Sequence, residues 1–552
     1  MNGARWLAEH LVEAERLVDE ARIEDVSCVE WVESLLRSSA SPRGRRCELS
    51  VRTLFVALQL GAFAGTLYLN YAVELLDELS PNDRARLGLP RTGSAVTYRQ
   101  VCYLVQRIND VLRRDFTEEN REDDTRYRDF DRVFGAIAVT GTHEDTARLS
   151  SIAVDGTDIS TWGTDTTFFE LRKKELGPHR YEAVTDENGE LVFDKVRVTT
   201  DADAAWRGSD NDQGKPAHFG YSLNVAVVAR DEGGSAAPLA AVAARLRPAN
   251  FQERASGLAC VAEARERRGF LGDVLVDRGY TSSKDGKDFL LPVRALGGDP
   301  VFDLTKYQVG PSGTVRGAVI IDGRPYSPSI PTSLLTVTPP RSGEDGTYKP
   351  DPKKVREYRE AVAARAVYAL DAHGVVRANG SQVFVCPGAA GKLDCPLRAP
   401  KRALRGDATL VLRTPKNPAA DSVCANAYPS LSLEDLPLYQ RHIYGTAEWA
   451  ASYSRRQTSV ETYFSQLKSA AGGVERGRIR VRGIVKTGLL VAFAMASTNR
   501  RAALAYETAK SRPAATRKHR SGRPRRHTLT TYREVAERAR RGATKPLRER
   551  GS

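Results

Sequence analysis

Three acidic residues of this chain stand in contexts where protein folds place catalytic carboxylates. Asp277 ends the apolar run Leu271–Val276 and precedes an Arg-Gly turn. Asp155 comes directly after Ile152–Val154 and just before a glycine. Short buried strands that end in a carboxylate beside a glycine turn are frequent positions for active-site groups in α/β folds. The third acid, Glu461, lies on a stretch with helical spacing of its apolar residues.

Carboxylates on two strands and one helix suit metal-dependent phosphoryl transfer. Hard divalent cations such as Mg²⁺ or Mn²⁺ prefer carboxylate oxygens and keep several waters. Two such ions about 3.5–4 Å apart can activate a hydroxyl and stabilise the leaving oxygen at a phosphate. Asp155, Asp277 and Glu461 are therefore the predicted catalytic residues and the predicted ligands of two ions. No His or Cys ligand is required, which suits a chain with only eight His.

A DNA substrate also requires positive charge around the acids, because phosphate contacts dominate the affinity of proteins for DNA. Lys468 follows Glu461 by seven positions, so it lies two helical turns further on, toward a neighbouring face. Arginines alternate with other residues through 476–482. The predicted DNA-binding residues are Lys468, Arg278, Arg456, Arg478, Arg480, Arg482, Arg523 and Arg525.

The positive charge of the chain is concentrated at its C-terminal end. The whole chain carries +14, and residues 508–552 hold 15 Lys or Arg against three acids. A basic tail on a near-neutral body predicts a polyanionic partner. Residues 511–526 contain almost no apolar side chains, so the tail 508–552 is predicted to be disordered without DNA, apart from a short helix at Tyr532–Arg541. Gly522–Arg526 resembles an AT-hook core; a solvated basic tail that binds any phosphate is the alternative.

Residues 1–145 are predicted to form a helical domain. Apolar residues recur at helical spacing within 4–20, 26–36 and 97–112. Two interpretations stay open for this domain, namely recognition of DNA ends through a helix-turn-helix-like unit and a scaffold bundle. Residues 53–73 carry no charge for 21 positions, which is long enough to span a bilayer. Because polar residues and glycines interrupt this stretch, a buried helix pair is the favoured prediction.

Residues 146–299 and 441–507 are predicted to form an α/β catalytic core in two parts. The first part reads as strand, strand, strand, helix and strand, at 152–154, 219–228, 239–246, 251–268 and 271–276. The second part contains the helix Tyr453–Ser469, which carries Glu461, and a buried helix at 489–496.

Between the two parts, residues 300–440 are predicted to form a mostly β insertion. Gly and Pro become frequent there, and Val319–Tyr326 is a hairpin candidate around Asp322-Gly323. Pro352–Ala366 is a predicted exposed helix, since proline suits a first helical turn. If this region is a separate lobe, its two ends must lie close together and its strands must stay out of the central sheet.

These motifs together resemble the DDE transposases of bacterial insertion sequences. Glu461 with Lys468 matches that family's Glu-x6-Lys signature, and Asp277-Arg-Gly-Tyr280 is similar to its second-Asp motif. The DADAAW–HFGYSLNVAVV passage, the IIDGRPYSP hairpin and the RGRIRVRG segment look like one subgroup, which carries a β-rich insertion between the second Asp and the Glu. The chain departs from the signature in one respect: Arg456 lies five residues before Glu461 instead of four. Tyr453, Arg455 and Arg456 are thus all candidates for the signature roles.

The resemblance, which covers roughly 152–501, implies an RNase H-like fold and transposase activity. Water would free a 3′-OH at the end of a mobile element, and that 3′-OH would attack target DNA without a covalent protein–DNA link. Glu461 would also orient the water, and Lys468 would hold a phosphate near the cut. The implied partners are double-stranded DNA, as terminal inverted repeats and as target, and a second copy in a homodimer on paired ends. No membrane partner is expected, and the implied location is cytoplasmic, at the nucleoid.

Other interpretations remain open. A nuclease or resolvase on the same fold would cut without joining, and a transposase-derived DNA-binding protein would only bind. The thiols of Cys386, Cys395 and Cys424 suggest zinc-knuckle turns, but their spacing matches no standard four-ligand pattern, so buried or free thiols are the plainer account. Seven cysteines make no disulfide scaffold, and acids at 9, 13 and 15 interrupt any signal-peptide pattern. The acids assigned to turns and loops instead of metal are Asp158, Asp201 and Asp203.

Overall fold

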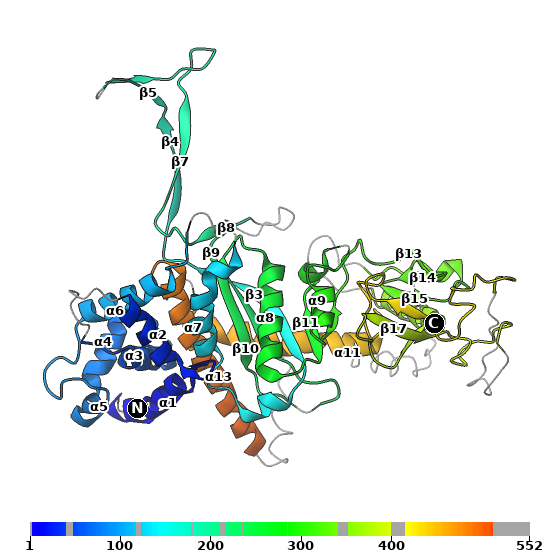
Figure 1. The fold of residues 1–552 in the computed structure, drawn as a ribbon, viewed down its shortest axis with the longest axis horizontal. Coiled ribbons are helices and arrows are strands. Elements are labelled where there is room, and N and C mark those ends of the chain that lie inside the picture. Colours follow the sequence, from blue (N-terminus) through cyan, green and yellow to red (C-terminus); the bar gives the residue numbers. More distant parts are fainter. Residues whose placement is uncertain are drawn as a thin grey trace, which may run out of the picture.

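The computed structural model describes residues 3–39, 48–117, 123–177, 180–208, 217–234, 236–283, 285–340, 351–398, 414–475 and 477–511. Figure 1 shows three parts in a row: a group of helices, a central sheet and a β-rich lobe, with a long two-stranded ribbon projecting from the middle. The C-terminal segment with Arg523 and Arg525, and with the predicted AT-hook core and short helix, lies outside the described residues.

The first 145 residues are mostly helical, as predicted. Capping residues begin several of these helices: Ser50 accepts a hydrogen bond from the Thr53 N–H, and Thr97 forms a reciprocal capping box with Gln100. The elements are α1 (Gly3–Glu20), β1 (Arg22–Ile23), β2 (Val26–Ser27), α2 (Cys28–Ser38), α3 (Val51–Phe63), α4 (Leu69–Glu78), α5 (Pro81–Arg86), α6 (Tyr98–Leu112) and α7 (Arg128–Ala138), with 3-10 turns at Asp124–Tyr127 and Glu144–Arg148.

The uncharged stretch 53–73 folds into α3 and the start of α4, which confirms the predicted helix pair. Helix α3 is buried along nearly its whole length. Among the described helices, none is both long and apolar enough to cross a membrane.

A mixed sheet forms the centre of the molecule. Its strand order is β10-β9-β3-β11-β12, and β8 adds to β9. Neighbouring strands are antiparallel from β10 to β3 and parallel from β3 to β12. The strands are β3 (Ile152–Ser160), β8 (Ala205–Arg207), β9 (His218–Val228), β10 (Ala241–Pro248), β11 (Asp273–Val276) and β12 (Asp299–Phe302).

The alternation of side chains along β3 divides the core into two layers. Ile152 and Val154 pack against Cys260 and Val261 of α8 (Glu253–Arg268). Ala153 faces the other way, into a layer shared with α7, with the helices at the N-terminus and with α13 (Ile484–Ser511), which extends well beyond the predicted 489–496. Residues 1–145 therefore have no core of their own, because their apolar side chains continue directly into the core under the sheet.

A projecting ribbon was not anticipated from the sequence. Strand β4 (Asp165–Leu171) pairs with β7 (Phe193–Thr199), and β5 (Lys173–Gly177) pairs with β6 (Arg180–Ala183). In Figure 1 this ribbon extends away from the sheet and the helices. The ribbon connects β3 to β8, so the chain leaves the central sheet at Ser160 and returns to it at Ala205.

The β-rich lobe carries separate hydrophobic clusters and small sheets. The predicted hairpin is confirmed: Asp322 and Gly323 both have positive φ, 51° and 76°, as a two-residue type I′ turn requires. The lobe and its approach contain α9 (Leu290–Ala295), β13 (Pro311–Val315), β14 (Ala318–Ile321), β15 (Arg324–Tyr326), α10 (Pro352–Ala366), β16 (Asp371–His373), β17 (Ser381–Val385) and β18 (Ser430–Ser432), with 3-10 turns at Arg278–Thr281 and Thr332–Leu334.

The two ends of this lobe lie side by side. Arg294 Nη1 donates to the Pro437 carbonyl at 2.9 Å, and the Phe302 N–H donates to Gln440 Oε1 at 3.0 Å. No described strand from 303 to 440 joins the central sheet. The expected boundary at residue 300 needs correction, since it falls inside β12, whose residues pair with β11.

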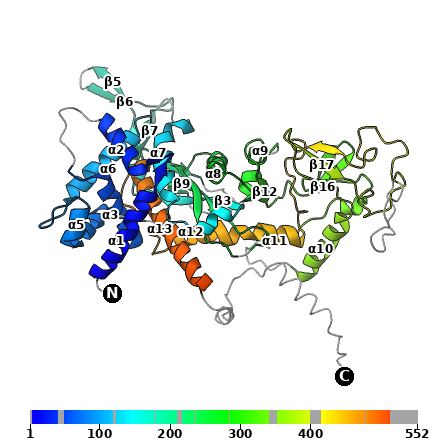
Figure 2. The ribbon, with the colours of Figure 1, turned by 60° about the horizontal axis from the view of Figure 1, so that its bottom comes forward.

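After the lobe, one continuous helix returns to the sheet. It consists of α11 (Ala447–Arg456), a π-helical turn (Gln457–Glu461) and α12 (Thr462–Leu467). Figure 2 shows α11 running from the β-rich lobe toward β3. Val460, Tyr463 and Leu467 of this helix are buried in the layer beneath the sheet, as the predicted apolar stripe requires.

Candidate active site

The sheet places Asp155 and Asp277 next to each other. Strands β3 and β11 are parallel neighbours, and Val154 pairs with Val276, so the two acids that follow occupy equivalent positions. Neighbouring strands lie about 4.8 Å apart. The two carboxylates also share a face, because both follow a residue that packs toward α8. The pairing of two parallel strands thus brings together residues separated by more than 120 positions in sequence.

The third acid reaches the same place through the π-helical turn Gln457–Glu461. A π turn contains one residue more than an α turn, so side chains five positions apart come onto one face. Arg456 and Glu461 are five apart, and Arg456 Nη1 lies 2.6 Å from Glu461 Oε1. The extra residue in the sequence spacing is therefore accommodated within the helix. Arg456, and not Arg455, is the arginine that contacts the acids.

Arg456 joins the helix to the sheet. Its Nη2 lies 2.6 Å from Asp155 Oδ2, while its Nη1 contacts Glu461, so one guanidinium bridges two of the three acids. The side chains of Arg456 and Asp155 are 11% and 17% exposed, whereas that of Glu461 is 46% exposed. The site is therefore a partly buried cluster that opens to solvent on the side of Glu461.

The electrostatic environment distinguishes Asp155 from an ordinary surface carboxyl. Burial raises the pKa of Asp155 to about 6. Its acidic neighbours Asp277 and Glu253 raise this pKa further, against the opposing effects of Arg456 and of the Gly156 N–H. A carboxyl held under such crowding is typical of functional sites, because folding alone gives no reason to gather like charges.

Glu253, at the start of α8, is a fourth acid that the sequence analysis did not single out. Its pKa is raised, chiefly by desolvation and also by Asp158 and Asp277. A Cβ built on Gly156 would lie 2.4 Å from Glu253 Oε1, so any larger residue at 156 would displace the Glu253 carboxylate from its present position. The sequence carried only a weak signal for Glu253, since an acid in the first turn of a helix is common on dipole grounds alone.

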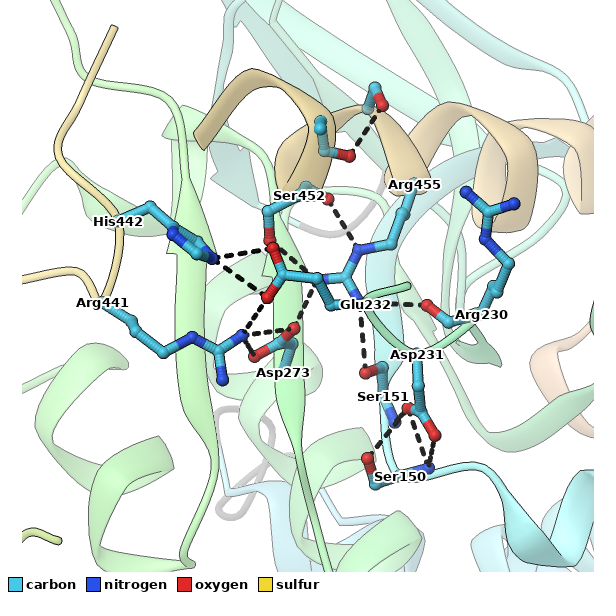
Figure 3. Close-up of polar contacts among 12 residues, drawn as sticks. Ser150, Ser151, Arg230, Asp231, Glu232, Asp273, Arg441, His442, Ser452 and Arg455 are labelled. Atoms are coloured by element: carbon cyan, nitrogen blue, oxygen red, sulfur yellow. Dashed lines mark hydrogen bonds and ion pairs between the residues drawn. The ribbon is translucent and has the colours of Figure 1, made fainter. Parts of the chain in front are cut away.

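Arg455 holds the acid-bearing helix in place. Figure 3 shows its guanidinium in a buried network at the base of β11, where it forms an ion pair with Asp273 and donates to the Arg230 carbonyl at 3.0 Å. The same network includes Arg441, whose Nη2 lies 2.9 Å from Asp273 Oδ1, and Ser452. The adjacent arginines thus differ in their contacts: Arg455 anchors the helix to β11, and Arg456 contacts Asp155 and Glu461.

Tyr453, the remaining candidate for a signature role, lies on the same side as the acids. Its ring stacks on Trp449 with centroids 5.4 Å apart. Burial raises the pKa of its hydroxyl, and the negative charges of Asp277 and Asp303 add to this rise. The tyrosine is therefore a neutral neighbour of the site.

Lys468 lies at the C-terminal end of α12, close to Asp158 and Arg207. Burial lowers its pKa, and the charge of Arg207 contributes in the same direction, while Asp158 opposes it. Asp158 itself forms an ion pair with Arg207 of β8. Lys468 thus lies near the part of β3 that follows Asp155, where it adds positive charge next to Asp158.

The neighbouring acids Asp201 and Asp203 serve the fold, in agreement with their assignment to loops. The Gly483 N–H donates to Asp201 at 3.1 Å and the Ile484 N–H donates to Asp203 at 2.9 Å, so the two carboxylates cap the start of α13. Asp203 also forms an ion pair with Arg113.

The other predicted DNA-binding residues within the described ranges are Arg278, Arg478, Arg480 and Arg482, which lie exposed or half-buried at the surface. Arg278 and Arg482 are exposed, and Arg478 pairs with Glu475 at 3.1 Å. The guanidinium of Arg480 stacks over the rings of Tyr68 and Trp162, 4.6 Å and 5.2 Å from their centroids.

The three thiols of the β-rich lobe share one small cavity. Cys386, Cys395 and Cys424 line it, with Arg398 at its wall. Burial raises the pKa of the Cys424 thiol, and the other two thiols add to the rise. The Ala389 N–H donates to Cys386 Sγ at 3.4 Å. The described residues show these cysteines as free thiols.

The donor chemistry of the acid cluster suits a hard cation such as Mg²⁺ or Mn²⁺, because carboxylate oxygens are the ligands that these ions prefer. Within the described ranges, however, no three His, Cys, Asp or Glu side chains are arranged to hold a metal ion. The guanidinium of Arg456 lies between Asp155 and Glu461. Asp155, Asp277 and Glu461 therefore fit a hard cation in the type of their donor atoms, but the ion pairs with Arg456 leave them without the arrangement of a metal site.

Comparisons with known proteins leave the chain without an assigned family. No protein-family model matches it. A search of curated proteins likewise finds no match.

Proposed function

We propose that this chain is a transposase that cleaves DNA at the ends of a mobile element and joins those ends to target DNA. The observation that carries the proposal has two parts: adjacent parallel strands lead into Asp155 and Asp277, and Arg456 joins Asp155 to Glu461. Two of these acids stand on adjacent parallel strands, and the third stands on a helix that returns after a lobe of its own. We take the mixed sheet with this arrangement as an RNase H-like core.

The chemistry proposed for the site is two-metal phosphoryl transfer. When bound, the two Mg²⁺ or Mn²⁺ ions would supply Lewis acidity at the scissile phosphate. Asp155, Asp277 and Glu461 are the proposed ligands. Glu461, the most exposed of the three with its side chain 46% exposed, is placed to accept a proton from an attacking water or 3′-OH that enters from solvent.

The proposed substrate is double-stranded DNA, as terminal repeats and as target. Lys468 is the proposed contact for a phosphate next to the cut, which is supported by its place near Asp158 on the strand that carries Asp155. The exposed residues Arg278, Arg480 and Arg482 would contact the flanking backbone. We further propose that two copies act together on paired ends, so that both ends are joined in one complex.

The experiment uses duplexes made from the DNA that flanks the gene, incubated with Mg²⁺ or Mn²⁺ and a plasmid target. The wild-type chain should release a 3′-OH at a defined position and join it to the plasmid, and Asp277→Asn should do neither. Both proteins should bind the duplex alike in gel-shift assays. Asp421→Asn, at an exposed position in the lobe, is the matched control and should remain active.

The products also separate the alternative functions. Cleavage without joined products would assign the chain to the nucleases and exclude the transposase proposal. Binding without cleavage in either metal would identify a DNA-binding protein derived from such an enzyme.

A further inference from the structure

We propose that Arg456 is a built-in counter-ion that excludes divalent metal from the acid cluster until a DNA phosphate draws the guanidinium away. Metal and DNA would then bind cooperatively. The inference rests on the proposed function for its ligands, metal ions and DNA, but it concerns the free protein and does not require catalysis.

The geometry of the guanidinium supports this role. Its two terminal nitrogens each lie 2.6 Å from an acid, Asp155 on the sheet and Glu461 on the helix. A cation bound by both carboxylates would occupy the space between them, which the guanidinium fills. Two positive groups in one partly buried space repel strongly, so occupation by Arg456 and occupation by metal exclude each other.

The contact is nevertheless built to be released. Arg456 Nε is buried and has no hydrogen-bond partner among the described residues. A buried unpaired N–H donor is unfavourable, so the bridging position leaves part of the guanidinium unsatisfied. Arg455, by contrast, donates from all three of its nitrogens, to Ser452, Ser151, Arg230 and Asp273. Neighbouring arginines on one helix thus differ in how firmly they are held.

The π-helical turn explains why the arginine reaches both acids. In an α-helical turn, residues four apart share a face, and Arg456 would align with Val460, which is buried in the core. The additional residue in the turn aligns Arg456 with Glu461 instead. Single π turns inside α-helices are frequent at functional sites, and this one creates the bridge.

A phosphate of DNA is the group suited to take over the guanidinium. The planar guanidinium fork matches phosphate oxygens in two-point contacts. Arg278 lies exposed next to Asp277, so the mouth of the site already carries a second cation for the same backbone. Removal of Arg456 from the acids would leave a crowded set of carboxylates that metal ions can neutralise. By thermodynamic linkage, DNA must then raise the affinity for metal by the same factor as metal raises the affinity for DNA.

The test measures Ca²⁺ binding by isothermal titration calorimetry, because Ca²⁺ takes carboxylate oxygens without the need for turnover. Arg456→Gln should bind Ca²⁺ at least about tenfold more tightly than the wild-type chain when DNA is absent, since close charge pairs have large coupling energies. Arg91→Gln, an exposed position with the same charge change, should bind as the wild type does. Asp155→Asn should abolish the tight binding in the Arg456→Gln background.

The coupling to DNA provides the second measurement. Duplex DNA from the gene's flanks should tighten Ca²⁺ binding to the wild-type chain and have little effect on Arg456→Gln. Arg456→Lys keeps one charge but loses the two-point bridge, so its Ca²⁺ affinity should fall between the two. It also preserves the test if Arg456→Gln fails to fold. Equal or weaker Ca²⁺ binding by both variants would overturn the inference, whether or not the chain cleaves DNA.

Discussion

Arg455 and Asp273 form an ion pair that is almost completely shielded from solvent, with side chains 3% and 5% exposed (Figure 3). The pair joins the acid-bearing helix to β11, the strand that directly precedes Asp277. Since the helix brings Glu461 and the strand brings Asp277, this pair sets their relative position. The geometry of the candidate active site therefore depends on a contact that takes no part in chemistry.

Replacement of Asp273 by Asn should destabilise the protein strongly. The substitution leaves the Arg455 guanidinium buried without its counter-charge, a defect that costs about 3–5 kcal/mol. Thermal unfolding followed by circular dichroism should show a clearly lower midpoint for Asp273→Asn. Asp435→Asn, at an exposed position, should unfold like the wild type. If the two variants unfold together, Asp273 does not hold the helix.

Replacement of Asp155 by Asn should change how stability depends on pH. The pKa of Asp155 is raised from 3.8 to about 6 in the folded chain, so the folded state holds a proton that the unfolded state has released. Stability from this group is fully present below its unfolded pKa and is lost as pH rises through about 6. Between the unfolded and the folded pKa of Asp155, the free energy of unfolding of the wild-type chain should fall by up to about 1.4 kcal/mol per pH unit relative to that of Asp155→Asn.

The free energies of unfolding of the wild-type chain and of Asp155→Asn can be measured by chemical denaturation with a chelator present. The measurements should be made about one pH unit apart, from about pH 4.5 to about pH 7.5. Wild type and Asp155→Asn should give parallel curves of unfolding free energy against pH if the pKa of Asp155 is not raised. A growing advantage of the variant toward neutral pH is the expected result.

Gly156→Ala should disturb the acid cluster from the side of α8. The added Cβ would meet Glu253 Oε1 at 2.4 Å and Asn224 Oδ1 at 3.1 Å, so Glu253 has to move. We expect Gly156→Ala to lose DNA cleavage and to have a lower free energy of unfolding. Addition of Glu253→Ala to the same chain should restore the free energy of unfolding. A double-mutant cycle of unfolding free energies checks this, since only side chains in contact show a coupling energy. Additive effects would mean that the two residues do not touch.

Removal of the basic tail should lower the salt dependence of DNA binding. Helix α13 extends to Ser511, where Lys510 Nζ lies 3.0 Å from Asp145, so a chain that ends at Ser511 keeps the fold intact. Each lost phosphate contact should reduce the slope of log affinity against log salt by about 0.9. An unchanged slope would show that the tail does not touch DNA. An equal reduction on AT-rich and GC-rich duplexes would favour a nonspecific tail over an AT-hook.

The local elements of this chain could be predicted from its sequence because they follow from residue periodicity and turn chemistry. The helix with Val460, Tyr463 and Leu467, the hairpin at Asp322-Gly323 and the strand before Asp277 all depend on near neighbours. The three acids could also be selected in this way. Asp155 and Asp277 follow short apolar runs, and Glu461 lies on an amphipathic helix seven positions before Lys468.

Only the tertiary structure decided which arginine meets the acids and which one holds the helix. Arg455 and Arg456 are adjacent and chemically identical, but neighbouring positions of a helix point in different directions, and the π turn after them aligns Glu461 with Arg456. Glu253, the buried caps on α13 and the shared core of the N-terminal helices likewise depend on contacts between residues far apart in the chain. Such contacts form only when the whole chain is packed. The pairing register of each strand and the face that each helix buries are set by the elements packed against it.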